Sequence, residues 1–136
     1  MHAPLTDYFN NGGHQPEKIK SRLYDFTSIR IEEMDQAGID MQILSHQSPG
    51  SQKLSDDIAV SACMKSNEEL AFVISNNSNR FDGFAMLPSN LPEFAAKELE
   101  RAVKDLGLKG VMLHGLSAGQ MVDEQKFWPI FAKAEE

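Results

Sequence analysis

The feature that most constrains this chain is a repeated change of hydrophobic period, from helical to extended and back. The segments with a helical period are 28–37, 54–76 and 90–106. The extended segments that follow them are Asp40–Ser45, Phe81–Leu87 and Lys109–His114. Strands that alternate with amphipathic helices form parallel sheets with right-handed crossovers. The pattern therefore predicts an α/β fold in which these three strands are parallel, adjacent and in chain order.

Local signals predict where the helices begin and end. Gly38 follows the first helix, where a left-handed C-terminal cap is favoured. Asn90, with Glu93 three residues later, predicts the start of the third helix. A last amphipathic helix is expected to begin near Asp123. Cys63 has helical spacing with apolar neighbours and is interpreted as a core residue.

The length limits which α/β architecture these units can build. A (β/α)₈ barrel takes about 250 residues, and this chain has 136. Three parallel strands make a poor free-standing sheet, so we expect a partial TIM barrel, incomplete at both ends. The expected division is an irregular arm over 1–16, rich in Pro, Asn and Gly, and a barrel segment over 17–136.

An incomplete barrel would leave the inner face of its sheet uncovered. The residues predicted for that face are Met41, Ile43, Ala85, Leu87 and Met112. Burying a side chain of this size contributes about 1.5–3 kcal/mol. We therefore expect self-association or a homo-oligomer.

Composition excludes several classes of partner. Lys and Arg number 13 against 20 Asp and Glu, a net charge of −7, which argues against nucleic acid or an anionic membrane surface. The single cysteine excludes an internal disulfide, and no apolar run approaches the length of a membrane span. No signal peptide is visible in the sequence, so a cytoplasmic location is expected.

Several runs, taken in order, resemble the amidohydrolase-related metal-dependent decarboxylases. These enzymes include the dihydroxybenzoate, γ-resorcylate and aminocarboxymuconate-semialdehyde decarboxylases. The first runs are Arg30…Met34-Asp35…Gly38-Ile39-Asp40…Ile43-Leu44-Ser45…Ser48-Pro49-Gly50 and Arg80-Phe81…Gly83-Phe84-Ala85…Leu87-Pro88. The later ones are Glu98-Leu99-Glu100-Arg101-Ala102-Val103…Leu106-Gly107…Lys109-Gly110 and Phe127-Trp128-Pro129-Ile130-Phe131…Ala134-Glu135-Glu136. The resemblance covers residues 17 to 136.

The resemblance implies a carboxy-lyase that acts on small aromatic or unsaturated carboxylic acids, in aromatic-compound or secondary metabolism. It implies Zn²⁺ or Mn²⁺ as cofactor. The family's Glu-x-His or His-x-His pair on the first barrel strand occurs nowhere in this sequence, so no metal ligand and no catalytic residue is assigned. The isolated chain is expected to bind divalent metal weakly. Two alternatives stay open: a hydrolase of the amidohydrolase type, and a non-catalytic, truncated barrel fragment.

Candidate pocket residues follow from the rule that barrel chemistry lies at the carboxyl ends of the strands. The residues at those positions are Ser45, His46, Ser48, Pro49, Pro88 and His114. His114 is the most interesting, because an imidazole at a strand exit can bind a metal or a carboxylate, or transfer a proton. Family members commonly present Asn-Gly at this point. The alternative is that each residue serves only the structure of its loop.

Overall fold

The sheet begins with two parallel strands that are separated in sequence by a long helix. The computed structural model describes the backbone from residue 17, and the side chains from residue 21, through residue 136. Strand β1 is Gln42–Leu44 and strand β2 is Phe81–Gly83. They pair in parallel, with Gln42 opposite Phe81 and Leu44 opposite Gly83. The predicted arm over 1–16 lies outside the described residues.

A third extended segment continues the sheet beyond β2. Ala85 forms a parallel bridge with Val111. Its N–H donates to the Gly110 carbonyl at 2.8 Å, and its carbonyl accepts from the Met112 N–H at 3.1 Å. The predicted order and direction of the three strands are therefore confirmed.

The predicted lengths of the strands were too long. Regular pairing of β2 ends at Gly83, and within Lys109–His114 it is reduced to the single bridge at Val111. The reason is that β1 leaves the sheet after Leu44, whose carbonyl accepts the last backbone bond, from the Phe84 N–H.

A short antiparallel hairpin after the third segment was not predicted. Strand β3, Leu116–Ser117, pairs with β4, Gln120–Met121. The two residues between them, Ala118 and Gly119, have φ values of 49° and 77°. A tight hairpin turn favours positive φ at both central residues and is usually signalled by Asn-Gly or Asp-Gly. Ala-Gly carries no such signal.

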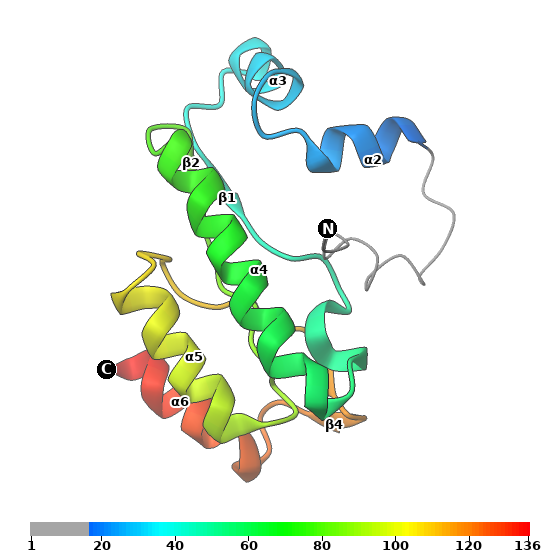
Figure 1. Ribbon diagram of the computed structural model, residues 1–136, viewed down its shortest axis with the longest axis vertical. Coiled ribbons are helices and arrows are strands. Elements are labelled where there is room, and N and C mark those ends of the chain that lie inside the picture. Colours follow the sequence, from blue (N-terminus) through cyan, green and yellow to red (C-terminus); the bar gives the residue numbers. More distant parts are fainter. Residues whose placement is uncertain (1–16) are drawn as a thin grey trace.

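Helices cover one face of this sheet and extend beyond one end of it. The α-helices are α2 (Glu17–Tyr24), α3 (Ile29–Ala37), α4 (Asp56–Asn76), α5 (Pro92–Lys104) and α6 (Trp128–Glu135). Two 3₁₀ helices, η1 (Gly50–Lys53) and η2 (Gln125–Phe127), precede α4 and α6. Figure 1 shows α4 running beside β1 and β2, with α5 and α6 packed together and α2 and α3 set apart at the other end.

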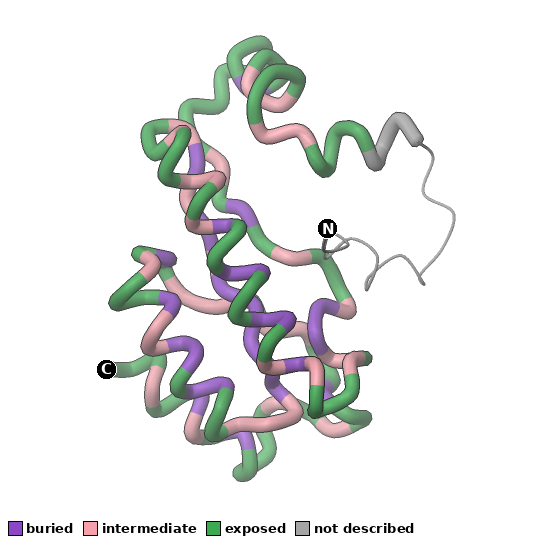
Figure 2. Tube along the Cα trace, viewed as in Figure 1, coloured by how far each residue is buried: buried purple, intermediate pink, exposed green. Residues whose placement is uncertain are grey.

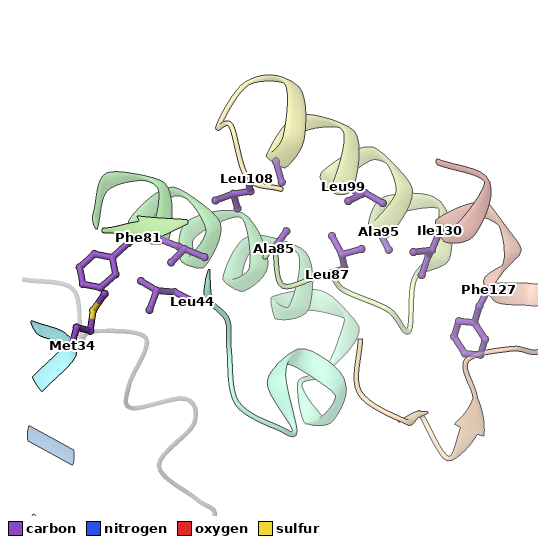
Figure 3. Packing of buried hydrophobic residues seen from close by; sticks show 12 residues of the cluster. Met34, Leu44, Phe81, Ala85, Leu87, Ala95, Leu99, Leu108, Phe127 and Ile130 are labelled. Atoms are coloured by element: carbon purple, nitrogen blue, oxygen red, sulfur yellow. The ribbon is translucent and has the colours of Figure 1, made fainter. Parts of the chain in front are cut away.

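The core lies between the sheet and the helices α4, α5 and α6. Figure 3 shows this row of side chains, from Met34 and Phe81 at one end to Ile130 and Phe127 at the other. In Figure 2 the buried positions of α4 form a stripe on the side of the helix that faces the strands. Cys63 is completely buried on α4, which confirms its interpretation as a core residue.

The other face of the sheet is partly uncovered. Met41 and Ile43 are about half exposed, at 48% and 49%, and Met112 is 37% exposed, as expected. The same expectation was wrong for Ala85 and Leu87, which are 0% and 3% exposed. Both belong to the core cluster on the helix side, because they continue the alternation of Phe81 and Gly83 along the strand.

The helix ends agree with the sequence in one case and differ in two. Gly38 has φ 68° and caps α3, as predicted. Leu91, rather than Asn90, is the N-terminal cap position of α5, and the Asn90 side chain accepts a hydrogen bond from Ser117 instead. The last helix begins at Trp128, after η2, and not near Asp123.

A buried side chain replaces the strand partner that β2 lacks beyond Gly83. The Asn67 amide, on α4, donates to the Met86 carbonyl at 2.9 Å, and its oxygen accepts from the Met86 N–H at 2.8 Å. The same amide donates to Glu98 at 2.7 Å, and Arg101 pairs with that carboxylate. Buried backbone groups need partners, so Asn67 allows β1 to leave the sheet.

Asn67→Ala should lower the free energy of unfolding by roughly 2–4 kcal/mol, because it leaves both backbone groups of Met86 buried without their partner and removes one of the two hydrogen bonds to Glu98 Oε1. Denaturant unfolding measures this. The matched control is Asn76→Ala on the exposed end of the same helix, expected within about 0.5 kcal/mol of the wild type. Equal effects of the two changes would contradict the assignment.

Candidate functional site

The loop that follows β1 crosses over the carboxyl ends of the other strands. Its 3₁₀ helix η1 binds both of them: Ser51 Oγ donates to the Leu87 carbonyl and Gln52 Nε2 donates to the His114 carbonyl, each at 2.5 Å. The Ser48–Pro49 peptide bond in this loop is cis. The three strand exits are thereby held together at one edge of the sheet.

His114 lies against the backbone of this loop. Gly50 has φ 56°, and a Cβ on it would lie 3.2 Å from Cδ2 and 3.4 Å from Nε2 of the His114 ring. The same point is 3.8 Å from Sδ of Met86. The edge therefore combines the imidazole of His114, the thioether of Met86 and the backbone of Gly50, which carries no side chain.

His46 is oriented toward the helix behind the strands. Its Nε2 shares a hydrogen bond with Ser66 Oγ on α4. Burial lowers the pKa of His46 below its ordinary value of 6.5, and the charge of His114 lowers it further. His46 is therefore favoured in its neutral form, as a support for the loop.

The other predicted pocket residues differ in their exposure. Ser45 and Ser48 are exposed at the strand edge, and Pro49 is half-buried before Gly50. Pro88 is completely buried and offers no surface to a bound molecule. The structure thus brings Gly50, at the end of this loop, together with His114, and leaves Pro88 in the interior.

Hydroxyl groups attach the β3–β4 hairpin to the same edge. Ser117 Oγ donates to the Asn90 side-chain oxygen at 2.6 Å and lies 2.8 Å from Ser89 Oγ. Ser89 and Ser117 are both buried. These bonds hold the loop that follows His114.

Two further features are not part of this edge. An open hollow of about 490 Å³ on α4 is lined by Lys65, Glu68, Glu69, Phe72 and Val73. Burial raises the pKa of the Cys63 thiol to about 12, which makes it unreactive.

In the described part of the chain, no helix is long and apolar enough to cross a membrane.

The metal chemistry implied by the resemblance has no ligand set among residues 17–136. No three His, Cys, Asp or Glu side chains gather there closely enough to hold an ion. What the edge offers chemically is one half-buried imidazole for a hydrogen bond or a charge, together with the exposed side chains of Ser45 and Ser48.

The residues that support this edge from behind were not predicted from the sequence. Gln52 and Ser51 follow the predicted loop directly, and Ser66 and Asn67 lie on α4. Asn67 carried a signal: it is four residues after Cys63 and three before Leu70, on the buried side of the helix.

Comparison with known proteins identifies the family to which this fold belongs. The family model described as "Amidohydrolase" matches residues 1–136. The chain belongs to this family. A γ-resorcylate decarboxylase from Polaromonas is 35% identical over 133 residues, covering 90% of this chain and 41% of that protein.

Solved structures agree with this assignment. The 2,6-dihydroxybenzoate decarboxylase from Rhizobium superposes with a TM-score of 0.86 at 31% identity, over 98% of this chain and 43% of that one. The 5-carboxyvanillate decarboxylase from Novosphingobium aromaticivorans, a complex with manganese and 4-hydroxy-3-methoxy-5-nitrobenzoic acid, gives 0.83 at 34% identity, over 93% and 36%. The partial barrel and the family resemblance are thereby confirmed, and the chain spans less than half the length of these relatives.

The lowered pKa of His46 predicts a loss of stability in acid. Because the folded protein binds a proton at His46 less readily than the unfolded chain, stability is full above about pH 6.5 and falls as the pH drops through the folded pKa. Unfolding of the wild type and of His46→Gln, compared between pH 7.5 and 5, measures this, and the variant should lose less stability. The opposite order would contradict the burial of a neutral His46.

Proposed function

We propose that these residues belong to a metal-dependent, non-oxidative decarboxylase of a small aromatic carboxylic acid. The observation that carries the proposal is the match, in order and in space, to decarboxylases of γ-resorcylate, 2,6-dihydroxybenzoate and 5-carboxyvanillate. The half-buried imidazole of His114 at the strand-end edge supports the proposal, because it can bind a carboxylate. Because the chain spans less than half of those proteins, the activity is proposed for the protein as a whole.

In this proposal the strand-end edge is one wall of the substrate pocket. His114 donates a hydrogen bond to the carboxylate or a phenolic oxygen of the acid, and the buried Gly50 and Met86 lie behind its imidazole. The half-buried position of His114 at this edge supports this arrangement. Ser45, Ser48 and Pro49 border the same wall, and His46 supports it through Ser66.

Decarboxylation requires orientation and exclusion of water more than covalent chemistry from this segment. The bond between the ring and the carboxyl carbon breaks, its electron pair stays on the ring carbon, and a proton replaces the departing CO₂. The loop over 45–50 excludes water from one side of the ring, and the imidazole fixes which oxygen faces the loop. The residue that delivers the proton is not assigned among residues 17–136.

The proposed cofactor is a divalent ion, Mn²⁺ or Zn²⁺. Two of the matched structures, those of 5-carboxyvanillate decarboxylase and of dihydroxybenzoic acid decarboxylase, contain manganese. When bound, such an ion supplies Lewis-acid stabilisation of negative charge on the substrate oxygens. The described residues do not form its site, so we derive no step through it.

A hydrolase is the second candidate, because the matching family is described as "Amidohydrolase". A hydrolase consumes water and releases no CO₂, so the product distinguishes the two. For either activity we propose a cytoplasmic enzyme of aromatic-compound or secondary metabolism. Its acidic composition argues against nucleic acid and membrane partners, and the exposed Met41 and Ile43 favour association between copies.

The direct test is incubation of the purified protein with Mn²⁺ and 2,6-dihydroxybenzoate or 5-carboxyvanillate. The expected result is loss of the acid with release of one CO₂ for each molecule of the corresponding phenol. Consumption of an amide or ester without CO₂ would favour the hydrolase. No turnover of either acid by the metal-loaded protein would contradict the proposal.

His114→Ala should raise KM for the acid by about tenfold or more, the cost of losing a hydrogen bond to a charged group. His114→Asn, which restores the amide common at this position, should recover part of that loss. Steady-state kinetics measures both. An unchanged KM in His114→Ala would exclude His114 from the substrate wall.

A further inference from the structure

The loop after β1 holds His114 by two separate contacts, one to its ring and one to its backbone. The ring lies against Gly50, 3.2 Å from the point that a Cβ would occupy. The backbone carbonyl accepts the Gln52 side-chain amide at 2.5 Å. These contacts link residues 62 to 64 positions apart in the sequence.

We propose that Gly50 and Gln52 are positioning residues that set where the His114 imidazole stands at the strand-end edge. Their consequence for substrate binding rests on the proposed function, whereas the placement of the ring does not. The loop then determines both the height of the imidazole above the backbone and the space left beside Met86.

Glycine is required at position 50 for two independent reasons. Its φ of 56° lies in the left-handed region, which other residues enter at a cost. The missing Cβ also leaves the space that the His114 ring occupies. A larger residue must therefore displace the imidazole as well as strain the turn.

Gln52 acts from the other side of the same residue. Its amide holds the carbonyl of His114, and its neighbour Ser51 holds the carbonyl of Leu87 at 2.5 Å. The loop is thus attached to the exits of both β2 and the third segment. Because its backbone is attached at one end and its ring rests on Gly50 at the other, His114 has little freedom to reorient.

The first experiment compares Gly50→Ala with Gly107→Ala by NMR of the histidine ring. Gly107 has φ 76° and no heavy atom within 4 Å of its Cβ position, so its substitution introduces the same kind of backbone strain without the contact. The His114 Hε1–Cε1 peak is identified by its loss in His114→Asn. Gly50→Ala should move this peak, and Gly107→Ala should leave it in place.

The second experiment removes the hydrogen bond without changing the loop backbone. Gln52→Met keeps the length of the side chain but not the donor, and Gln42→Met is its control, because it removes a Gln42–Arg30 bond. We expect Gln52→Met to shift the His114 peak and to raise KM by about three- to tenfold, with kcat little changed. Gln42→Met should do neither.

The outcomes separate the two proposals. A His114 peak that stays in place in Gln52→Met overturns the positioning role, even if Gly50→Ala fails to fold. A displaced peak supports it. Absence of decarboxylation in the wild type overturns the proposed function alone, because the histidine resonances decide the positioning role without turnover.

Discussion

The structure depends on one interruption of the sheet, where buried backbone groups need hydrogen-bond partners from outside the sheet. After Leu44, β1 leaves the sheet, and the next backbone groups of the neighbouring segment, those of Met86, lose their strand partner. Asn67 supplies both missing hydrogen bonds from α4 and is itself held by Glu98. Buried backbone groups without partners are too costly to persist. The side-chain amide therefore makes it possible for the chain to leave the sheet at this point.

That departure creates the candidate site. The chain released from β1 turns over the strand ends as η1, and its own side chains bind the carbonyls of Leu87 and His114. Gly50 then passes beneath the His114 ring. The departure of the chain from the sheet therefore brings the imidazole of His114 close to the thioether of Met86 and the backbone of Gly50. These groups lie at the carboxyl ends of the strands, the edge at which barrel enzymes bind their substrates.

Much of this architecture could be predicted from hydrophobic period alone. The alternation of apolar and polar residues over 39–43, and the helical spacing over 54–76, are enough to predict the order and direction of the strands. The strand lengths could not be predicted, because they depend on a tertiary hydrogen bond from Asn67. The assignment of Ala85 and Leu87 to the inner face failed for a related reason, since short apolar runs do not show which side faces the helices.

The site was predictable only in part. The position of His114 and of the loop over 45–50 followed from the rule on strand ends, whereas the contact between Gly50 and His114 spans 64 residues and leaves no local signal. Gln52 looks like an ordinary polar residue of a loop. Contacts between residues that are far apart in the sequence are identified only in the folded structure. The contacts of Gly50 and Gln52 with His114 were found in this way.

In the proposed function, the exits of the three strands form a wall that binds an aromatic acid. The most direct measurement is the change in backbone amide chemical shifts when 2,6-dihydroxybenzoate is titrated into the protein. We predict that the largest changes gather on residues 45–52, Met86 and residues 113–115. Changes confined to other surfaces, such as the hollow at Lys65, Glu69 and Phe72 on α4, would contradict the claim.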